Sequence, residues 1–158
     1  MNYRTADIKD LNLLVKERLD FIKINEKDIR YETVYNNCCQ YFEKAIKEDM
    51  CDIILAEEEG ECIGTGIIFY YLSVPSAFNM AGKNAYITSM YVKAEYRRGG
   101  IGTTILKELI HKAAQKGYEI IMLSASDMGR PLYYKMGFIE SKNGMILDNR
   151  KLKNTLQV

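Results

Sequence analysis

Residues Tyr96–Thr104 have the sequence YRRGGIGTT and lie between an apolar, β-like run, Ala85–Val92, and an amphipathic, helix-like run, Ile105–Lys116. This order predicts a strand, a basic glycine turn and the N-terminus of a helix. Such an N-terminus binds phosphate well, because its unpaired N–H groups point outward, its macrodipole favours an anion and glycines allow a close backbone approach. Arg97 and Arg98 add guanidinium groups suited to phosphate oxygens. The stretch, named the glycine cradle here, is predicted to bind a pyrophosphate group.

The spacing of the glycines disfavours two common nucleotides. The dinucleotide fingerprint needs a third glycine where Ile105 stands, and no acidic residue is found where the partner of the ribose should follow. The ATP-binding P-loop needs a Gly-Lys-Ser/Thr string, which the chain does not contain. The remaining pattern, Arg97-x-x-Gly100-x-Gly102, resembles the coenzyme A signature (Gln/Arg-x-x-Gly-x-Gly/Ala) of the GNAT superfamily of acetyl-CoA-dependent N-acetyltransferases. Taken alone, the pattern is also compatible with a plain turn before a helix.

A second motif adds to this resemblance. Residues Leu132–Phe138 have the pattern Leu-Tyr-x-x-x-Gly-Phe, which is similar to the short helix that carries a catalytic tyrosine in the GNAT superfamily. Ser126 or Asp127 is predicted to cap this helix, and Gly137 to take the left-handed conformation after its end. Together with the opening Tyr3–Asp7, the resemblance covers essentially the whole chain.

Composition is compatible with one domain spanning residues 1–158. The chain is 47% hydrophobic and 27% charged, which suits a single well-buried core. Its net charge of +1 gives no reason to expect a nucleic-acid or membrane partner. Neither a signal peptide nor an apolar run long enough to span a bilayer is apparent, so a cytoplasmic protein is expected. A monomer and a homodimer both stay open.

The cysteines are expected to be free thiols. Cys38, Cys39, Cys51 and Cys62 show no C-x-x-C spacing, and no neighbouring base marks an acyl-carrying thiol. No metal is expected, since the single histidine, His111, has no ligand spacing to a cysteine and is interpreted as a surface residue.

The hydrophobic pattern predicts an α/β fold. Hairpins early in the chain favour antiparallel pairing, and a later strand–helix–strand favours one parallel pair. The resemblance implies the same architecture: a single-domain GNAT-like fold, with a mixed, mostly antiparallel sheet, one splayed parallel strand pair and flanking helices. The predicted elements are strands at 2–5, 53–57, 62–71, 85–92, 119–124, 138–141 and 144–147, and helices from Asp7 or Asp10, at 35–47, at 105–116 and around Tyr133.

The resemblance also implies how such a site works. The pantetheine arm of acetyl-CoA would lie where the parallel strands splay apart, and a backbone N–H there would polarise the thioester carbonyl. An acceptor amine would attack directly, through a tetrahedral intermediate, and Tyr133 would protonate the departing sulfur. The alternative for Tyr133 is a packing residue. The coenzyme-binding residues implied are Met90, Tyr91, Val92, Arg97, Arg98, Gly99, Gly100, Ile101, Gly102 and Thr103.

The general base and the acceptor are left open by the sequence. Glu26, Asp28 and Glu32 lie between the first two predicted helices and are candidates for the base. A water chain through Ser89 or Thr88 is equally compatible, as is an acceptor amine that arrives already neutral. Three alternatives to an acetyltransferase remain: a catalytically silent coenzyme A sensor or regulatory module, a domain that binds another phosphate-bearing nucleotide, and a transferase of a longer acyl group.

Overall fold

The computed structural model describes residues 1–141 of the chain. By its contacts the chain divides into two compact units, one of Met1–Ser124 and one that begins at Ala125. The first unit contains the sheet with its helices, and the second contains the short helix α4 (Arg130–Lys135). Each unit is described by itself.

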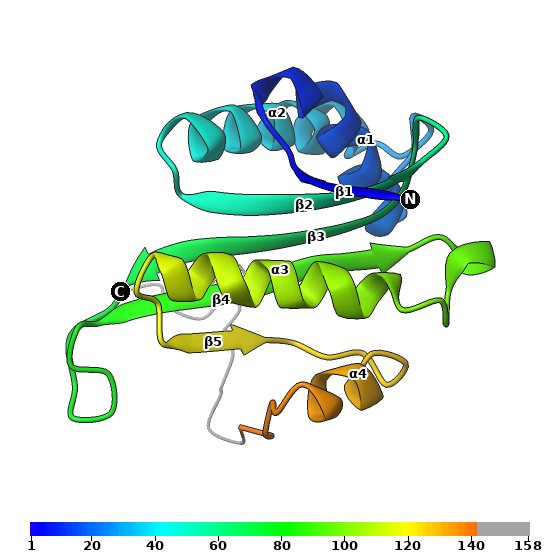
Figure 1. Ribbon diagram of the computed structural model, residues 1–158. Helices are drawn as coiled ribbons and strands as arrows, with labels where there is room; N and C mark the ends of the chain where they lie inside the picture. The colour runs from blue at the N-terminus through cyan, green and yellow to red at the C-terminus, as the bar shows by residue number, and fades with distance from the viewer. Residues whose placement is uncertain (142–158) are drawn as a thin grey trace, which may run out of the picture. The chain divides into compact units, whose positions relative to one another are not determined.

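The first unit is built on a five-stranded sheet with the order β1-β2-β3-β4-β5 (Figure 1). Neighbouring strands are antiparallel, except that β4 and β5 are parallel. This confirms the predicted mixed, mostly antiparallel sheet with one parallel pair. The strands are β1 (Asn2–Thr5), β2 (Cys51–Glu58), β3 (Glu61–Leu72), β4 (Lys83–Val92) and β5 (Ile120–Leu123).

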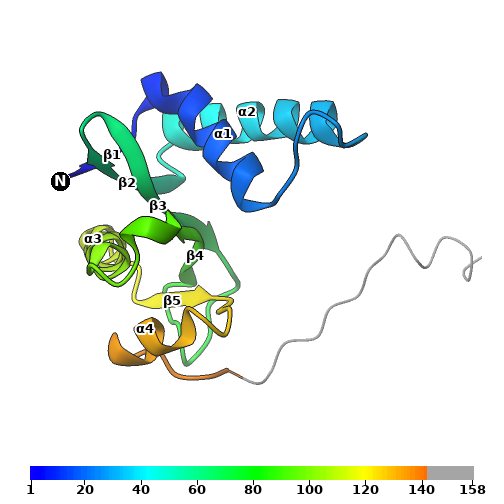
Figure 2. The ribbon, with the colours of Figure 1, turned by 90° about the vertical axis from the view of Figure 1, so that its right-hand side faces the viewer.

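Helices cover both faces of the sheet. Figure 2 shows α1 (Leu11–Phe21) and α2 (Tyr31–Lys47) on one side of the strands and α3 (Ile101–Gln115) on the other. The short 3-10 turn η1 (Ile8–Asp10) precedes α1. Of the two residues predicted to begin this helix, Asp7 caps η1, because its carboxylate accepts a hydrogen bond of 2.7 Å from the N–H of Lys9, and Asp10 stands at the N-cap of α1 without a side-chain cap bond. The crossover through α3 is what allows β4 and β5 to be parallel.

The apolar side chains of α1 recur at helical spacing and face the sheet. Leu14, Val15 and Leu19 are all at most 4% exposed, and they pack with the buried Ile53 and Leu55 of β2. On the opposite face, α3 packs over β2, β3 and β4 through its buried residues. These residues are Ile101, Ile105, Leu106, Leu109 and Ala113.

Gly66 of β3 lets α3 lie close to the sheet. A Cβ built on Gly66 would lie 2.5 Å from Ile105 Cγ2 and 2.7 Å from Met90 Sδ, both closer than packed atoms approach. We therefore expect Gly66→Val to lower the free energy of unfolding by about 3 kcal/mol, the upper part of the range for overpacked cores. Urea unfolding measures it. The control is Gly99→Ala, whose Cβ would meet Tyr96 O at an ordinary 3.5 Å; equal losses in both variants would contradict this assignment.

Element boundaries differ from the sequence-based expectations where polar residues or glycines begin a helix. The second helix begins at Tyr31 instead of residue 35, and α3 begins at Ile101 instead of residue 105. Residues 138–141 form no strand, contrary to prediction, because the N–H of Phe138 bonds to Tyr133 O (3.0 Å) and completes the end of α4. The strand predicted at 144–147 lies outside the described residues. None of the helices within residues 1–141 has both the length and the hydropathy needed to cross a bilayer.

Candidate functional site

The glycine cradle joins β4 to α3, as the sequence predicted. After Val92 ends β4, a single 3-10 turn, η2 (Ala94–Tyr96), leads into the cradle, and α3 begins at Ile101. Gly100 has a φ of 86° and Arg98 a φ of 65°, so both adopt the left-handed conformation, which costs glycine little. Both residues are exposed. The turn is therefore open to a ligand from solvent.

The first turn of α3 carries N–H groups that precede the helical ladder. The first intrahelical bond runs from Thr104 N to Gly100 O, at 3.0 Å. The amides of Ile101, Gly102 and Thr103 come before it in the chain, where an α-helix has no acceptor to offer. These three N–H groups and the positive end of the helix dipole thus lie directly after the exposed residues 97–100, which include the two arginines. This is an arrangement suited to an anion.

The two arginines of the cradle are placed differently. Arg97 Nε donates a hydrogen bond of 2.9 Å to Val92 O, which turns its side chain back toward the end of β4. Arg98 is exposed, and its backbone is left-handed. A phosphate group at the first turn of α3 would therefore have one guanidinium beside the strand end and another free to approach from solvent.

The two edges of β4 are paired over different lengths. On the β3 side, pairing continues to Val92. On the β5 side, parallel pairing covers Asn84 to Ile87 and stops there, together with β5 itself. Within the pairing of residues 1–141, the β5 side of β4 has no ladder partner beyond Ile87, over a stretch that includes Met90 and Tyr91. The ladder between β4 and β5 thus ends before Met90 and Tyr91, the stretch where the resemblance implied a splay.

A β-bulge interrupts β4 where its pairing with β5 ends. The β3–β4 register pairs Thr65 with Tyr91 and Ile67 with Thr88. On β3 a single residue separates Thr65 from Ile67, whereas on β4 two residues separate Thr88 from Tyr91. Strand β4 therefore has one extra residue here. Ser89 lies in the bulge with a φ of 52°. This left-handed conformation costs a residue with a Cβ about 1–2 kcal/mol.

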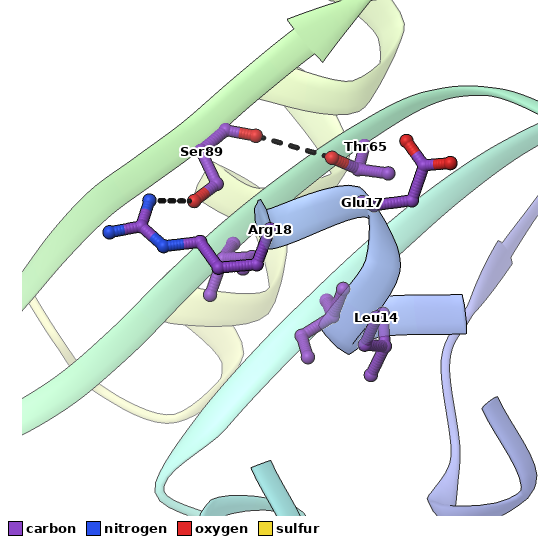
Figure 3. Close-up of a pocket in the computed structure, with 7 residues that line it drawn as sticks. Leu14, Glu17, Arg18, Thr65 and Ser89 are labelled. Carbon is purple, nitrogen blue, oxygen red and sulfur yellow. Dashed lines mark hydrogen bonds between the residues drawn. The ribbon is translucent and has the colours of Figure 1, made fainter. Parts of the chain in front are cut away.

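Two hydrogen bonds hold Ser89 in this conformation (Figure 3). Arg18 Nη1 donates to Ser89 Oγ at 2.8 Å, and Thr65 Oγ1 donates to Ser89 O at 3.3 Å. Arg18 comes from α1, and its guanidinium also lies 5.5 Å from the centre of the Phe21 ring. Helix α1 and strand β3 therefore both contact the bulge.

A small cavity lies between α1 and the sheet, beside the bulge. Its volume is about 10 Å³, which is close to the space of one water molecule. Leu14, Glu17, Arg18, Thr65 and Ser89 are among its lining residues (Figure 3). Burial raises the pKa of Glu17. This carboxylate therefore accepts a proton more readily than an exposed one.

Sequence reasoning missed both Glu17 and Arg18, since charged residues on an amphipathic helix usually face solvent. The sequence did contain a signal for them: Glu17 and Arg18 follow the apolar Leu14 by three and four positions, and residues at those spacings share a helix face.

The three acidic residues predicted as candidate general bases are less well placed to accept a proton. Glu26 and Glu32 are exposed, and Asp28 is paired with Arg30, which lowers the pKa of Asp28 to about 2.

The four cysteines are free thiols, as predicted. Burial raises the pKa of Cys51 and of Cys62 to about 11, so the reactive thiolate is scarce at neutral pH. His111 is exposed, as expected. Within residues 1–141, no three His, Cys, Asp or Glu side chains come together in a way that could hold a metal ion.

Tyr133 lies on α4, in the second unit. It is 9% exposed, and its ring packs edge-on against Phe138, with 5.9 Å between the ring centres. Gly137 has a φ of 89°, as predicted, and the N–H groups of Gly137 and Phe138 bond to the carbonyls of Tyr134 and Tyr133. This is a Schellman ending, which explains why Gly-Phe follows the helix.

The cap and the two tyrosines of α4 differ in detail from expectation. Gly129, and neither Ser126 nor Asp127, occupies the N-cap position, because Ser126 instead accepts a bond from the Gly129 N–H (3.3 Å) and stabilises the turn before the helix. Burial raises the pKa of Tyr133. Tyr134 is exposed, and its hydroxyl donates to Glu140 at 2.5 Å. The two adjacent phenols thus have different environments.

Solved structures of similar fold include acetyltransferases. A crystal structure of a predicted acetyltransferase with acetyl-CoA from Clostridium acetobutylicum is 31% identical, has a TM-score of 0.86, and the match covers 95% of this chain and 97% of that one. A GCN5-related N-acetyltransferase from Ralstonia eutropha is 21% identical, with a TM-score of 0.81 and coverage of 94% and 98%, which shows a shared fold.

Sequence comparisons agree. A thialysine N-epsilon-acetyltransferase from Bos taurus is 31% identical over 127 residues, which are 75% of this chain and 66% of that protein. The chain thus spans just under two thirds of the length of that relative. The sequence profile of the acetyltransferase (GNAT) family matches residues 16–138, a range that holds the bulge, the glycine cradle and α4. The chain belongs to the acetyltransferase (GNAT) family.

Proposed function

We propose that the chain transfers an acetyl group from acetyl-CoA to a primary amine, by direct attack of the amine on the thioester. The observation that carries this proposal is the β5 side of β4, which has no ladder partner beyond Ile87 within residues 1–141 and leads through η2 into the glycine cradle. One continuous path thus offers backbone partners to an extended arm and an anion site to a pyrophosphate. The relative from Clostridium acetobutylicum, named with acetyl-CoA, supports the choice of ligand.

Each part of the path has a role in this proposal. Arg97, Arg98 and the first-turn amides of α3 bind the pyrophosphate, and the hydroxyl of Thr103 adds a contact. Backbone groups of Met90 to Val92 bind the pantetheine arm. One N–H of that stretch polarises the thioester carbonyl and stabilises the oxyanion that forms during attack.

Proton transfers complete the reaction. Tyr133 donates a proton to the departing sulfur, since a neutral phenol is a workable acid toward a thiolate. The amine loses its proton to water or to an acidic side chain. Asp28 is a weak base because of its low pKa, so Glu26, Glu32 and water remain, and Glu17 beside the bulge joins them.

An amine at the end of an amino-acid side chain is the acceptor class that we propose to test first. This choice rests on the names of relatives from Bos taurus, Mus musculus and Sus scrofa, all thialysine N-epsilon-acetyltransferases. We also infer that residues 1–158 act as one domain, since the match to the family profile extends across both compact units.

Calorimetric titration of the purified chain tests the proposal. We expect one-to-one binding of acetyl-CoA, and no competition from ATP or NAD, because the glycine spacing suits neither. Release of free thiol from acetyl-CoA is then measured with thialysine, lysine, a polyamine and an aminoglycoside as acceptors. We expect thialysine or lysine to give the largest rate.

The other outcomes separate the alternatives. Tight binding without amine-dependent thiol release would favour a coenzyme A sensor. Competition by ATP or NAD would favour a domain for another nucleotide. Faster thiol release from a longer acyl-CoA would retain the fold and the site but change the donor. Absence of acetyl-CoA binding would overturn the proposed function.

A further inference from the structure

Ser89 differs from the other residues that adopt a positive φ. The non-glycine residues of this kind within residues 1–141 are Lys23, Asp49, Glu59, Ser89 and Arg98. The other four lie after a helix or in a turn, where left-handed residues are common. Ser89 lies inside a strand and is 6% exposed. Such a conformation persists only where the surroundings enforce it.

The hydrogen bond from Arg18 is the side-chain contact best suited to enforce the left-handed conformation of Ser89. It is charge-assisted, measures 2.8 Å, and joins residues 71 positions apart in the sequence. The guanidinium is itself fixed by the Phe21 ring, one turn further along α1. The bond from Thr65 holds the carbonyl of Ser89 (3.3 Å) but leaves its side chain free. Arg18 therefore fixes the rotamer of Ser89 from outside the sheet (Figure 3).

The bulge at Ser89 sets which face of the sheet each of the residues after it, up to Val92, points to. Met90 Sδ lies on the α3 side of the sheet, near Gly66 and Ile105. Tyr91 pairs with Thr65, whose side chain faces the cavity under α1. If the extra residue were lost, the register would slip by one residue, and each residue after Ser89 would turn to the opposite face and edge. The backbone groups proposed to bind acetyl-CoA would then point away from it.

We propose that Arg18 is a positioning residue of the acetyl-CoA site: through Ser89 it holds the β4 bulge in the form that presents Met90 and Tyr91 to the thioester. The inference rests on the proposed function, and it adds a side chain of α1 to a site otherwise formed by β4 and the glycine cradle. Arg18 touches neither the coenzyme nor the acceptor in this proposal.

Arg18→Met tests the proposal, because methionine keeps much of the apolar stem and removes the donor. We expect kcat/KM for acetyl-CoA to fall about 10²-fold, the size of effect produced by small misplacements of reacting groups. Arg18→Lys, which retains a charge and one donor group, should lie between Arg18→Met and the unchanged protein. The matched control is Lys16→Met, which removes an exposed charge from the same helix and should leave kinetics unchanged.

Rescue by glycine at the bulge distinguishes positioning from a general loss of stability. Glycine adopts the left-handed conformation without strain, so Ser89→Gly should make Arg18 dispensable. The double variant Arg18→Met with Ser89→Gly should recover kcat/KM to within about threefold of Ser89→Gly alone, since coupled residues deviate from additivity. A double variant as impaired as Arg18→Met alone would overturn the proposal.

A readout on the free protein keeps this test separate from the proposed function. In amide NMR spectra without ligand, Arg18→Met should shift the cross-peaks of Met90 and Tyr91 but not that of Gly102. In a protein that already carries Ser89→Gly, adding Arg18→Met should leave the Met90 and Tyr91 cross-peaks in place. Unshifted Met90 and Tyr91 cross-peaks would overturn the positioning role, whether or not the chain binds acetyl-CoA. Failure of the unchanged protein to bind acetyl-CoA, with shifted cross-peaks, would overturn the proposed function alone.

Discussion

Gly100→Val should weaken acetyl-CoA binding about 10²-fold. Gly100 has a φ of 86°, which a β-branched residue adopts only with strain, so the cradle must change shape. A Cβ at this position would meet nothing within 4 Å of the protein. It would therefore project into the open space that the proposed pyrophosphate group occupies. If the distorted cradle loses two of its charge-assisted hydrogen bonds to the pyrophosphate, at about 1.5 kcal/mol each, the affinity falls about 10²-fold. Calorimetric titration with acetyl-CoA measures it.

The matched control is Gly60→Val in the β2–β3 hairpin. Gly60 has a φ of 82° and, like Gly100, no heavy atom within 4 Å of a built Cβ. Both variants should therefore lose similar amounts of folding stability, which thermal unfolding measures. Only Gly100→Val should lose coenzyme affinity. Equal affinities in the two variants would remove the glycine cradle from the binding site.

Tyr133→Phe should lower kcat about 10²-fold while the KM for acetyl-CoA stays within about twofold. General acid catalysis contributes about 10²–10⁴-fold, and removal of the phenol hydroxyl leaves the ring and its packing against Phe138 in place. A group that acts only on the departing sulfur contributes little to ground-state binding, so kcat and kcat/KM should fall together. Steady-state kinetics with the best acceptor measure both.

Tyr134→Phe is the control for this variant. It removes the hydroxyl of an adjacent, exposed tyrosine that bonds to Glu140, and it should leave kcat unchanged. The pH dependence provides a second check. Burial raises the pKa of Tyr133, so the phenol should stay protonated at neutral pH, and its loss of the proton should lower the rate only at a pH above the ordinary range of a tyrosine. A full-rate Tyr133→Phe variant would make Tyr133 a packing residue.

The sequence predicts those parts of the structure that depend on local backbone chemistry. Gly137 adopts the left-handed conformation predicted from its position after a helix, because glycine tolerates that conformation best. The same holds for the cap at Asp7. The hairpin between β2 and β3 was likewise placed within two residues at each strand end, because Glu59 and Gly60 interrupt two apolar runs.

The contacts that shape the bulge could not be predicted in this way. Serine has no preference for the left-handed conformation, and the arginine that holds it comes from a helix far away in the sequence. Only the packing of α1 on the sheet brings Arg18 and Ser89 together. The prediction of a strand at residues 138–141 was wrong for a related reason. Phenylalanine favours strands, but the N–H of Phe138 is already hydrogen-bonded to Tyr133 O at the end of α4.

The unequal pairing of the two sides of β4 bears on ligand selectivity. A strand edge without a ladder partner carries alternating donors and acceptors, and a molecule satisfies them only if it has amide groups of its own at a similar repeat. The pantetheine arm has two such amides, whereas ATP and NAD have only sugars and phosphates in the corresponding part. Discrimination among nucleotides would then reside in the free edge of β4 as well as in the glycine spacing of the phosphate turn, and the edge would select the arm that follows the pyrophosphate.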